Sequence, residues 1–280
     1  MDRRNFLKTG GIALLGSLAT GSAMALTTPG ALGGEGADKK AAVALAMNHF
    51  GVSEADLKKV LAAALEKGGD YADLFFEHTI SNSIRLMDGA VNNSYSNIDY
   101  GVGVRVLTGD QSGYAYVENI TVEDMLKAAR TAARIASANK GNKPLNLTEK
   151  ELKKNYYTVA SPWEEVSLKD KMPYLQKLND RIFALDKRVH KVQASQSDTT
   201  SHIFFCNSEG VMFYDYRPMV TLGAVCIMEE DGKTENGYAA RAYRRGFDFL
   251  SDEVVDVIAR EAVDQTSLLF KAIKPKGGEM

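Results

Sequence analysis

The sequence is poor in cysteine, which limits how the fold could be held together. Two cysteines, Cys206 and Cys226, occur among its 280 residues. That number is too small for a disulfide framework or a cysteine-rich zinc site. We expect both to be buried free thiols, with a single disulfide in an oxidising compartment as the alternative. The chain is long enough to bury a hydrophobic core without such crosslinks.

Histidine is also scarce, and the pattern of a short metal motif is missing. The four histidines, His49, His78, His190 and His202, are far apart in the sequence. No two of them have the spacing of a helical zinc motif such as His-Glu-x-x-His. We therefore predict no catalytic residue and no metal ligand in this chain. Glu77 and His78 are expected to form a surface pair, and His202 to have a structural role.

The chain has no block of like charges. Its formal net charge is −2, and basic and acidic residues are interleaved along it. This pattern disfavours a stripe that follows a phosphate backbone, so we expect no nucleic-acid partner. The basic and aromatic segment 238–245 leaves two interpretations open. Its arginines could contact a substrate or partner, or the segment could be the polar face of a strand.

The first residues have the order of an export signal. Arg3 and Arg4 precede Phe6 and Leu7, an arrangement that resembles the twin-arginine (Tat) signal, which exports folded proteins. Residues 10–23 then form a weakly apolar stretch that is shorter and richer in glycine and serine than a bilayer-spanning helix. We expect a cleaved signal and no stable membrane anchor.

Small residues follow where a signal peptidase accepts them. Ala23 and Ala25 stand at the −3 and −1 positions of a cleavage site. Together with the paired arginines, they predict export to the periplasm by the Tat route.

Composition and hydrophobic pattern divide the chain into six segments. A signal is followed by a Gly- and Ala-rich leader, and a polar connector separates two folded units. The predicted segments are a signal peptide (1–25), a flexible leader (26–52), a first domain (53–138), a connector (139–166), a second, central domain (167–274) and the start of a further domain (275–280).

Within each folded unit, helical periodicity alternates with a period of two. Ser53 and the acid three residues later predict the start of the first helix. Hairpin signals at Asp88-Gly89 and Asp231-Gly232 favour antiparallel pairing of short strands. The predicted fold class is α+β, with two units that are each an antiparallel sheet flanked by helices. The strands are expected at 71–80, 83–87, 94–98, 101–107, 113–117, 190–197, 201–206, 211–216, 219–229 and 233–244.

One run of residues resembles a known family. The segment from Asn97 to Arg105, Asn-Ile-Asp-Tyr-Gly-Val-Gly-Val-Arg, is similar to the N-terminal domain of TldD, of the TldD/PmbA family of metallopeptidases. Residues 70–76 and 113–116 extend the likeness in the first unit. Residues 215–218 and 229–233 extend it in the second.

The resemblance implies a zinc-dependent peptidase that cuts unfolded peptides inside a cavity enclosed by a dimer. The dimer would be a homodimer or a heterodimer with a PmbA/TldE-type subunit. In the family, a His-Glu-x-x-x-His helix and a later cysteine hold the zinc, and both come after the position that matches Gly278. We therefore expect this chain to be the N-terminal and central part of an exported zinc peptidase, to bind no zinc itself and to be inactive alone. The alternative is a non-catalytic periplasmic module that binds peptides or regulates another protein.

Overall fold

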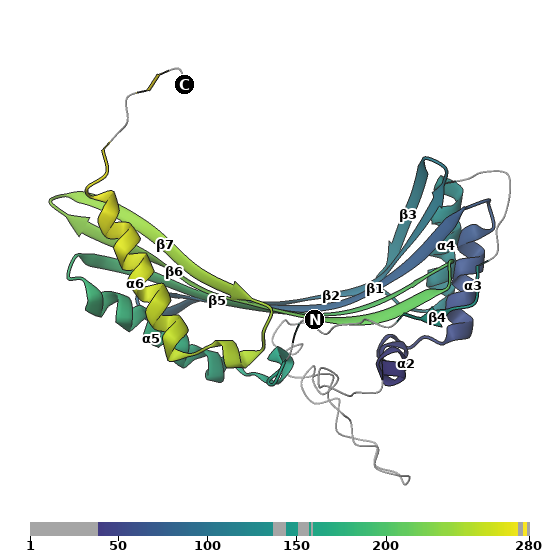
Figure 1. The fold of residues 1–280 in the computed structure, drawn as a ribbon, viewed down its shortest axis with the longest axis horizontal. Helices are drawn as coiled ribbons and strands as arrows, with labels where there is room; N and C mark the ends of the chain where they lie inside the picture. Colours follow the sequence, from purple (N-terminus) through teal and green to yellow (C-terminus); the bar gives the residue numbers. More distant parts are fainter. Residues whose placement is uncertain (1–38, 137–143, 151–156, 158, 274–276, 279–280) are drawn as a thin grey trace, which may run out of the picture.

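The described residues form one curved sheet with helices packed against one of its faces (Figure 1). The computed structural model describes residues 39–136, 144–150, 157, 159–273 and 277–278. The sheet has seven strands in the order β3-β2-β1-β5-β6-β4, and β7 also pairs with β6. The predicted α+β class is confirmed. The sheet is continuous, however, where the sequence pattern suggested a separate sheet in each unit.

The strands are longer than their hydrophobic patterns indicate. All strand pairs are antiparallel except the short parallel contact of β4 with β6. The predicted interruptions inside the long strands are absent, because polar residues continue the pairing there. The strands are β1 (Tyr71–Met87), β2 (Ala90–Thr108), β3 (Gln111–Val117), β4 (Thr148–Glu149), β5 (Val189–Asn207), β6 (Val211–Glu230) and β7 (Lys233–Tyr243).

The helices begin at side chains that satisfy free backbone N–H groups. The Ser53 hydroxyl accepts from the Asp56 amide, and the Asp56 carboxylate accepts from the Ser53 amide, so the predicted capping box is present. Thr121 and Ser251 accept backbone N–H groups in the same way. The described helices are α2 (Lys39–Phe50), α3 (Glu54–Leu65), α4 (Val122–Ile135), α5 (Leu168–Leu185) and α6 (Asp252–Leu269), with short 3-10 turns η2 (Trp163–Glu165) and η3 (Phe247–Phe249).

Helix α2 lies within the segment that composition suggested to be a flexible leader. Val43, Ala46 and Phe50 recur at helical spacing and are buried against the sheet. The end of the helix is closed by Gly51, whose φ of 67° is in the left-handed region, and Val52 donates to the carbonyl of Met47 at 2.9 Å. The C-terminal part of the expected leader is thus packed helix.

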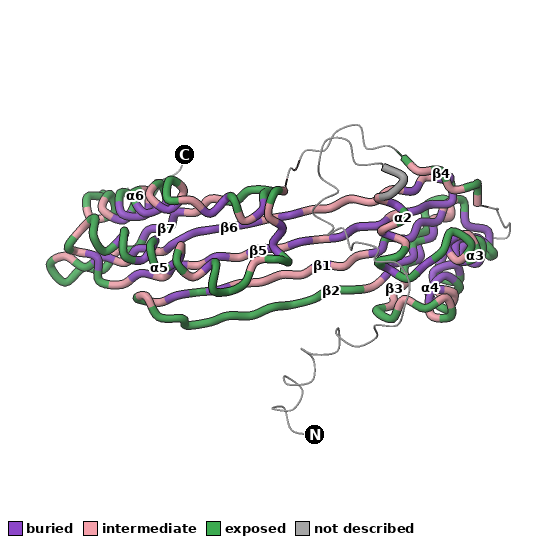
Figure 2. Tube along the Cα trace, turned by 90° about the horizontal axis from the view of Figure 1, so that it is seen from below, coloured by how far each residue is buried: buried purple, intermediate pink, exposed green. Residues whose placement is uncertain are grey.

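Two hydrophobic clusters lie at opposite ends of the same sheet face. Leu74 and Phe76 of β1 belong to the first cluster, and Ile84 and Leu86 of the same strand belong to the second. All four have even numbers, so the period of two places them on one face. Helices α2, α3 and α4 cover this face at one end, and α5 and α6 cover it at the other (Figures 1 and 2). The opposite, concave face carries no helix among the described residues.

The hairpin turns have the conformation that the sequence predicts. Asp88 and Gly89 have φ angles of 50° and 79°, and Asp231 and Gly232 have 50° and 75°. Positive φ at both central residues is the type I′ geometry, which matches the twist of the flanking strands. Both turn predictions are confirmed.

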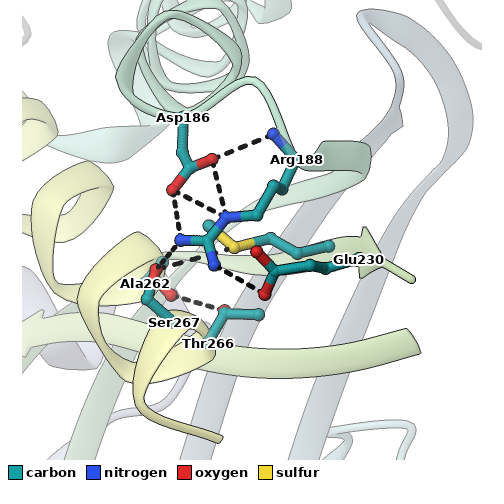
Figure 3. Close-up of polar contacts among 7 residues, drawn as sticks. Asp186, Arg188, Glu230, Ala262, Thr266 and Ser267 are labelled. Carbon is teal, nitrogen blue, oxygen red and sulfur yellow. Dashed lines mark hydrogen bonds and ion pairs between the residues drawn. The ribbon is translucent and has the colours of Figure 1, made fainter. Parts of the chain in front are cut away.

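An arginine at the far end of the second cluster joins two helices to the sheet (Figure 3). Nη2 of Arg188 lies 2.7 Å from Oδ2 of Asp186, just after α5, and Nη1 lies 3.0 Å from Oε2 of Glu230 on β6. The same guanidinium donates to the Ser267 hydroxyl of α6 at 3.2 Å. Because guanidinium has five donors in a fixed plane, one residue can fix three elements.

Both cysteines are buried free thiols and they lie in different clusters. Cys206 belongs to the first cluster and Cys226 to the second. Burial raises the pKa of the Cys226 thiol, with a similar effect on Cys206. No helix among the described residues is long and apolar enough to cross a membrane.

Candidate functional site

A buried polar strip separates the two hydrophobic clusters on the helix-bearing face. Its centre is four successive even positions of β5: Gln196, Asp198, Thr200 and His202. Each is at most 4% exposed. Burial of a polar side chain is unfavourable unless the side chain finds hydrogen-bond partners. The partners of these four residues therefore define the local structure.

Three histidines meet at one end of the strip. His78 of β1 and His202 of β5 are direct cross-strand partners, and His49 reaches them from the end of α2. The ring of His49 stacks on both, with centroids 4.9 Å away in each case, and the other two centroids are 5.9 Å apart. Nε2 of His49 and Nδ1 of His78 share a hydrogen bond of 2.8 Å. We call these three residues the histidine cluster.

A carboxylate and two tyrosines complete this part of the strip. Nε2 of His202 lies 3.0 Å from Oε1 of Glu164, and Nδ1 lies 2.7 Å from the Tyr214 hydroxyl. Oε2 of Glu164 accepts from the hydroxyls of Tyr216 at 3.1 Å and Thr200 at 3.3 Å. Burial favours a raised pKa for Glu164, but the hydrogen bonds, with that from His202 largest, outweigh it and leave the pKa lowered.

The environment also changes the proton affinity of the histidines. Burial, followed by the imidazoles of His202 and His78, lowers the pKa of His49 to about 4. Burial and the neighbouring His202 ring lower the pKa of His78. Both effects disfavour a charged imidazole. Neutral rings therefore predominate for His49 and His78 at neutral pH.

The other end of the strip contains a buried ion pair. Nζ of Lys171, on α5, lies 2.5 Å from Oδ2 of Asp198, and both side chains are almost fully buried. Asn82 donates to Oδ1 of the same carboxylate at 3.0 Å, and Gln196 donates to Oδ2 at 2.9 Å. The Lys171 ammonium also lies 5.3 Å from the centre of the Trp163 ring. This pair connects α5 to the centre of β5.

The geometry of the histidine cluster does not suit a metal ion. Both ring nitrogens of His202 already have partners, and the three rings stack instead of pointing their nitrogens at one position. No group of three His, Cys, Asp or Glu residues in the described part of the chain is arranged to hold a metal ion. We therefore derive no metal-dependent step from these residues.

No local sequence pattern indicates this cluster. Glu77 and His78, expected to form a surface pair, point to opposite faces of β1, and Glu77 accepts from the Thr79 hydroxyl at 2.6 Å. The structural role expected for His202 is found, but with partners from four other elements. His190 lies apart, 3.9 Å from Glu229. The strand register brings residues 78 and 202 together and the packing of α2 adds residue 49, and no local pattern encodes either.

The arginines of segment 238–245 are bound within the protein. Arg241 pairs with Glu261 of α6 at 2.7 Å, and Arg245 pairs with Asp248. Arg244 lies over the Tyr157 ring at 5.2 Å. These contacts favour an internal structural role over a free binding site, and they stabilise the connection from β7 to α6.

A second candidate site is the open edge of β2. Strand β3 pairs with β2 only from Val102 to Thr108, so Ala90–Gly101 has no neighbouring strand on its outer side in the described part of the chain. Tyr95 and Ile98 on this edge are 58% and 61% exposed. The edge contains no lysine or proline and a single charge, Asp99. It therefore lacks the devices that usually block pairing with another chain.

The concave face beside this edge is rich in hydroxyl groups. Thr79 and Ser201 hydrogen-bond across β1 and β5 at 2.8 Å, and Ser81 and Thr199 at 3.3 Å. Odd positions of these strands face away from the helices, so these side chains form the floor of the concavity. The predicted targeting residues Arg3, Arg4, Phe6 and Leu7 and the cleavage residues Ala23 and Ala25 lie outside the described residues.

Two family models match the chain. The PmbA/TldA metallopeptidase domain 1 matches residues 72–136, and the central domain of the same metallopeptidases matches residues 161–270. The chain belongs to the TldD/PmbA metallopeptidase family. This confirms the resemblance seen in the sequence over the first and central regions.

Named relatives agree with this assignment. The metalloprotease TldD homolog of Haemophilus influenzae is 31% identical over 221 residues, which are 75% of this chain and 45% of the relative. A metalloprotease of Methanocaldococcus jannaschii is 26% identical over 219 residues, 75% of this chain and 47% of the relative. The chain thus spans about half the length of the curated relatives it matches.

Solved structures share the fold at low sequence identity. TldE from Thermococcus kodakarensis has a TM-score of 0.57 at 16% identity, over 76% of this chain and 47% of that one. A Thermotoga maritima protein, described as a candidate modulator of a DNA gyrase, has a TM-score of 0.63 at 18% identity, over 80% of this chain and 50% of that one. The long curved sheet is thus a fold that other proteins also have.

We predict that the buried ion pair is a sensitive point of the fold. Lys171→Ala leaves the Asp198 carboxylate buried without its cation, so the free energy of unfolding should fall by about 3–5 kcal/mol. Chemical denaturation of the full chain measures this loss. The matched control is Lys177→Ala on the same helix, whose exposed pair with Asp252 should contribute about 1 kcal/mol or less.

A double variant separates charge burial from lost packing. Lys171→Met with Asp198→Asn removes both charges and keeps an acceptor oxygen for Asn82 and Gln196, so it should lose less stability than Lys171→Ala. Equal losses for Lys171→Ala and Lys177→Ala would contradict this account of the strip.

Proposed function

We propose that this chain provides the first and central domains of an exported TldD-like zinc metallopeptidase that acts on unfolded peptides. Its role in that enzyme is to bind the extended substrate. The zinc ligands would lie in the half of the family's length that these residues do not match. The observation that carries the proposal is the open edge of β2 in a chain of a metallopeptidase family.

An unpaired strand edge suits an unfolded substrate for a physical reason. An extended peptide adds to such an edge through main-chain hydrogen bonds. Every residue except proline has the backbone N–H that donates them. The exposed side chains of Tyr95 and Ile98 lie on opposite faces of β2, so each offers apolar contact area to peptide residues on its own face. A folded protein has few free backbone groups of this kind, so the edge selects for unfolded chains.

The outer edge of β7 is less suited to bind an extended peptide than the β2 edge. Strand β7 pairs with β6 only, in the described part of the chain. Its residues include Lys233, Glu235 and Arg241, and charged side chains discourage strand addition at an edge. The two edges therefore differ in their charged side chains, and the β2 edge is the better site for the addition of a peptide strand.

The proposed assembly is a dimer, either of two copies or with a PmbA/TldE-type subunit. The similarity of the fold to TldE supports a partner built on the same plan. A second function, a non-catalytic peptide-binding or regulatory module, uses the same β2 edge without hydrolysis. Reading the gene beyond codon 280 separates the two: an open frame that encodes the His-Glu-x-x-x-His helix supports the enzyme, and an in-frame stop supports the module.

We predict that lysines on the β2 edge weaken peptide binding. Tyr95→Lys with Asn97→Lys should lower affinity for an uncharged, labelled unfolded peptide by tenfold or more, because lysine opposes strand addition. Fluorescence anisotropy with the 280-residue chain measures it. The control is Thr234→Lys with Asn236→Lys on β7, which adds the same charge at exposed positions. Equal effects of the two pairs, or no binding by the unmodified chain, would count against the proposal.

We also predict that export depends on the paired arginines. Arg3→Lys with Arg4→Lys should leave most precursor in the cytoplasm, because the Tat route reads the arginine pair itself. Cell fractionation followed by immunoblotting measures the distribution. The control is Lys8→Arg, which keeps the charge and leaves the pair intact. An unchanged periplasmic yield in the double variant would rule out the Tat route.

A further inference from the structure

We propose that the histidine cluster is a pH-dependent docking contact, which holds α2 on the sheet near neutral pH and releases it in acid. The inference rests on the way His49, His78 and His202 are arranged and is independent of the proposed peptidase function.

The hydrogen bond between α2 and β1 requires at least one neutral ring. Nε2 of His49 and Nδ1 of His78 are 2.8 Å apart, so one nitrogen must donate a proton and the other must accept it. A protonated imidazole has N–H groups at both nitrogens and no acceptor. When both rings are protonated, two N–H groups face each other, and the bond is replaced by repulsion.

Among the described residues, the surroundings offer one counter-charge for three rings. Glu164 of η2 is the carboxylate beside the cluster, and it already accepts from His202, Tyr216 and Thr200. The other titratable groups that face the rings are Tyr214 on β6 and Tyr100 on β2, whose ring lies 5.4 Å from that of His78. Both are neutral near pH 7. Asp198 is engaged with Lys171 further along β5.

The direction of the pH effect follows from the lowered proton affinity of the docked rings. The pKa of His49 is lowered to about 4 and that of His78 is also lowered, whereas a released histidine titrates near its ordinary value of about 6.5. The released state therefore binds more protons. Docking is fully favoured above about pH 6.5 and is progressively lost as the pH falls towards about 4.

Helix α2 is the element that can move. It is the first element of the described chain, and the turn at Gly51 joins it to α3. Its apolar contacts come from Val43, Ala46 and Phe50. The Phe50 ring lies 5.4 Å from Phe76 and 6.4 Å from Phe204. Release of α2 would thus expose an aromatic patch on β1 and β5, which gives the acid form a new apolar surface.

Hydrogen exchange of the full chain tests the inference. After correction for the intrinsic pH dependence of exchange, protection of the α2 amides should fall on the order of tenfold between pH 7.5 and pH 5.0. Protection of α3 and α4 should stay constant and serves as the internal reference. Constant protection of α2 over this range would overturn the proposal.

Variants show whether the histidines are responsible. His49→Gln with His78→Asn keeps polar side chains that do not titrate here, so the pH dependence should disappear. The control His190→Gln, remote from the cluster, should behave as the unmodified chain. An undiminished pH dependence in the double variant would contradict the proposal.

A direct titration covers the case in which the double variant fails to dock α2 at any pH. The ring protons of His49 and His78 in the unmodified chain should both titrate below the ordinary histidine value of about 6.5 by nuclear magnetic resonance. Titration of both rings at about 6.5, as in an exposed histidine, would refute the contact.

Discussion

The unbroken antiparallel pairing of β1 with β5 is the constraint on which the rest of the structure depends. The register runs without a shift from Asp73 opposite Asn207 to Met87 opposite Gln193. Because side chains alternate, a slip of one residue would move every core residue of a strand to the concave face. Both hydrophobic clusters are therefore positioned by one ladder, and neither end of the sheet can be shifted alone.

The same ladder explains why the centre of the sheet is polar. In the described part of the chain, the even positions at the middle of β5 meet polar groups in place of an apolar helix face: Glu164 of η2, Lys171 of α5 and His49 at the end of α2. Partners satisfy the side chains of Asp198, Thr200 and His202, which offsets the cost of burying them, whereas Oε1 of Gln196 has no hydrogen-bond partner among the described residues. The centre then provides specific polar contacts between the two clusters. Because β3 is short, residues 90–101 of β2 have no strand on their outer side in the described part of the chain, which creates the open edge.

Much of the fold could be predicted because its signals are local. Capping at Ser53, the turns at Asp88-Gly89 and Asp231-Gly232 and the helical stripes each depend on a few adjacent residues. The continuity of the strands could not be predicted in this way. Segments such as Ser195–Ser201 lack hydrophobic alternation, and cross-strand hydrogen bonds maintain the ladder instead. The histidine cluster was missed for the same reason, since it combines residues from a helix and two strands whose register is a long-range property.

Hydrogen exchange at the centre of β5 tests the continuous ladder most directly. If the sheet is one cooperative unit, amides of residues 195–201 should have opening free energies within about 1 kcal/mol of those at Val192 and Cys206. Exchange of residues 195–201 at the rate of an unfolded chain, with both ends protected, would show two separate sheets and contradict the account.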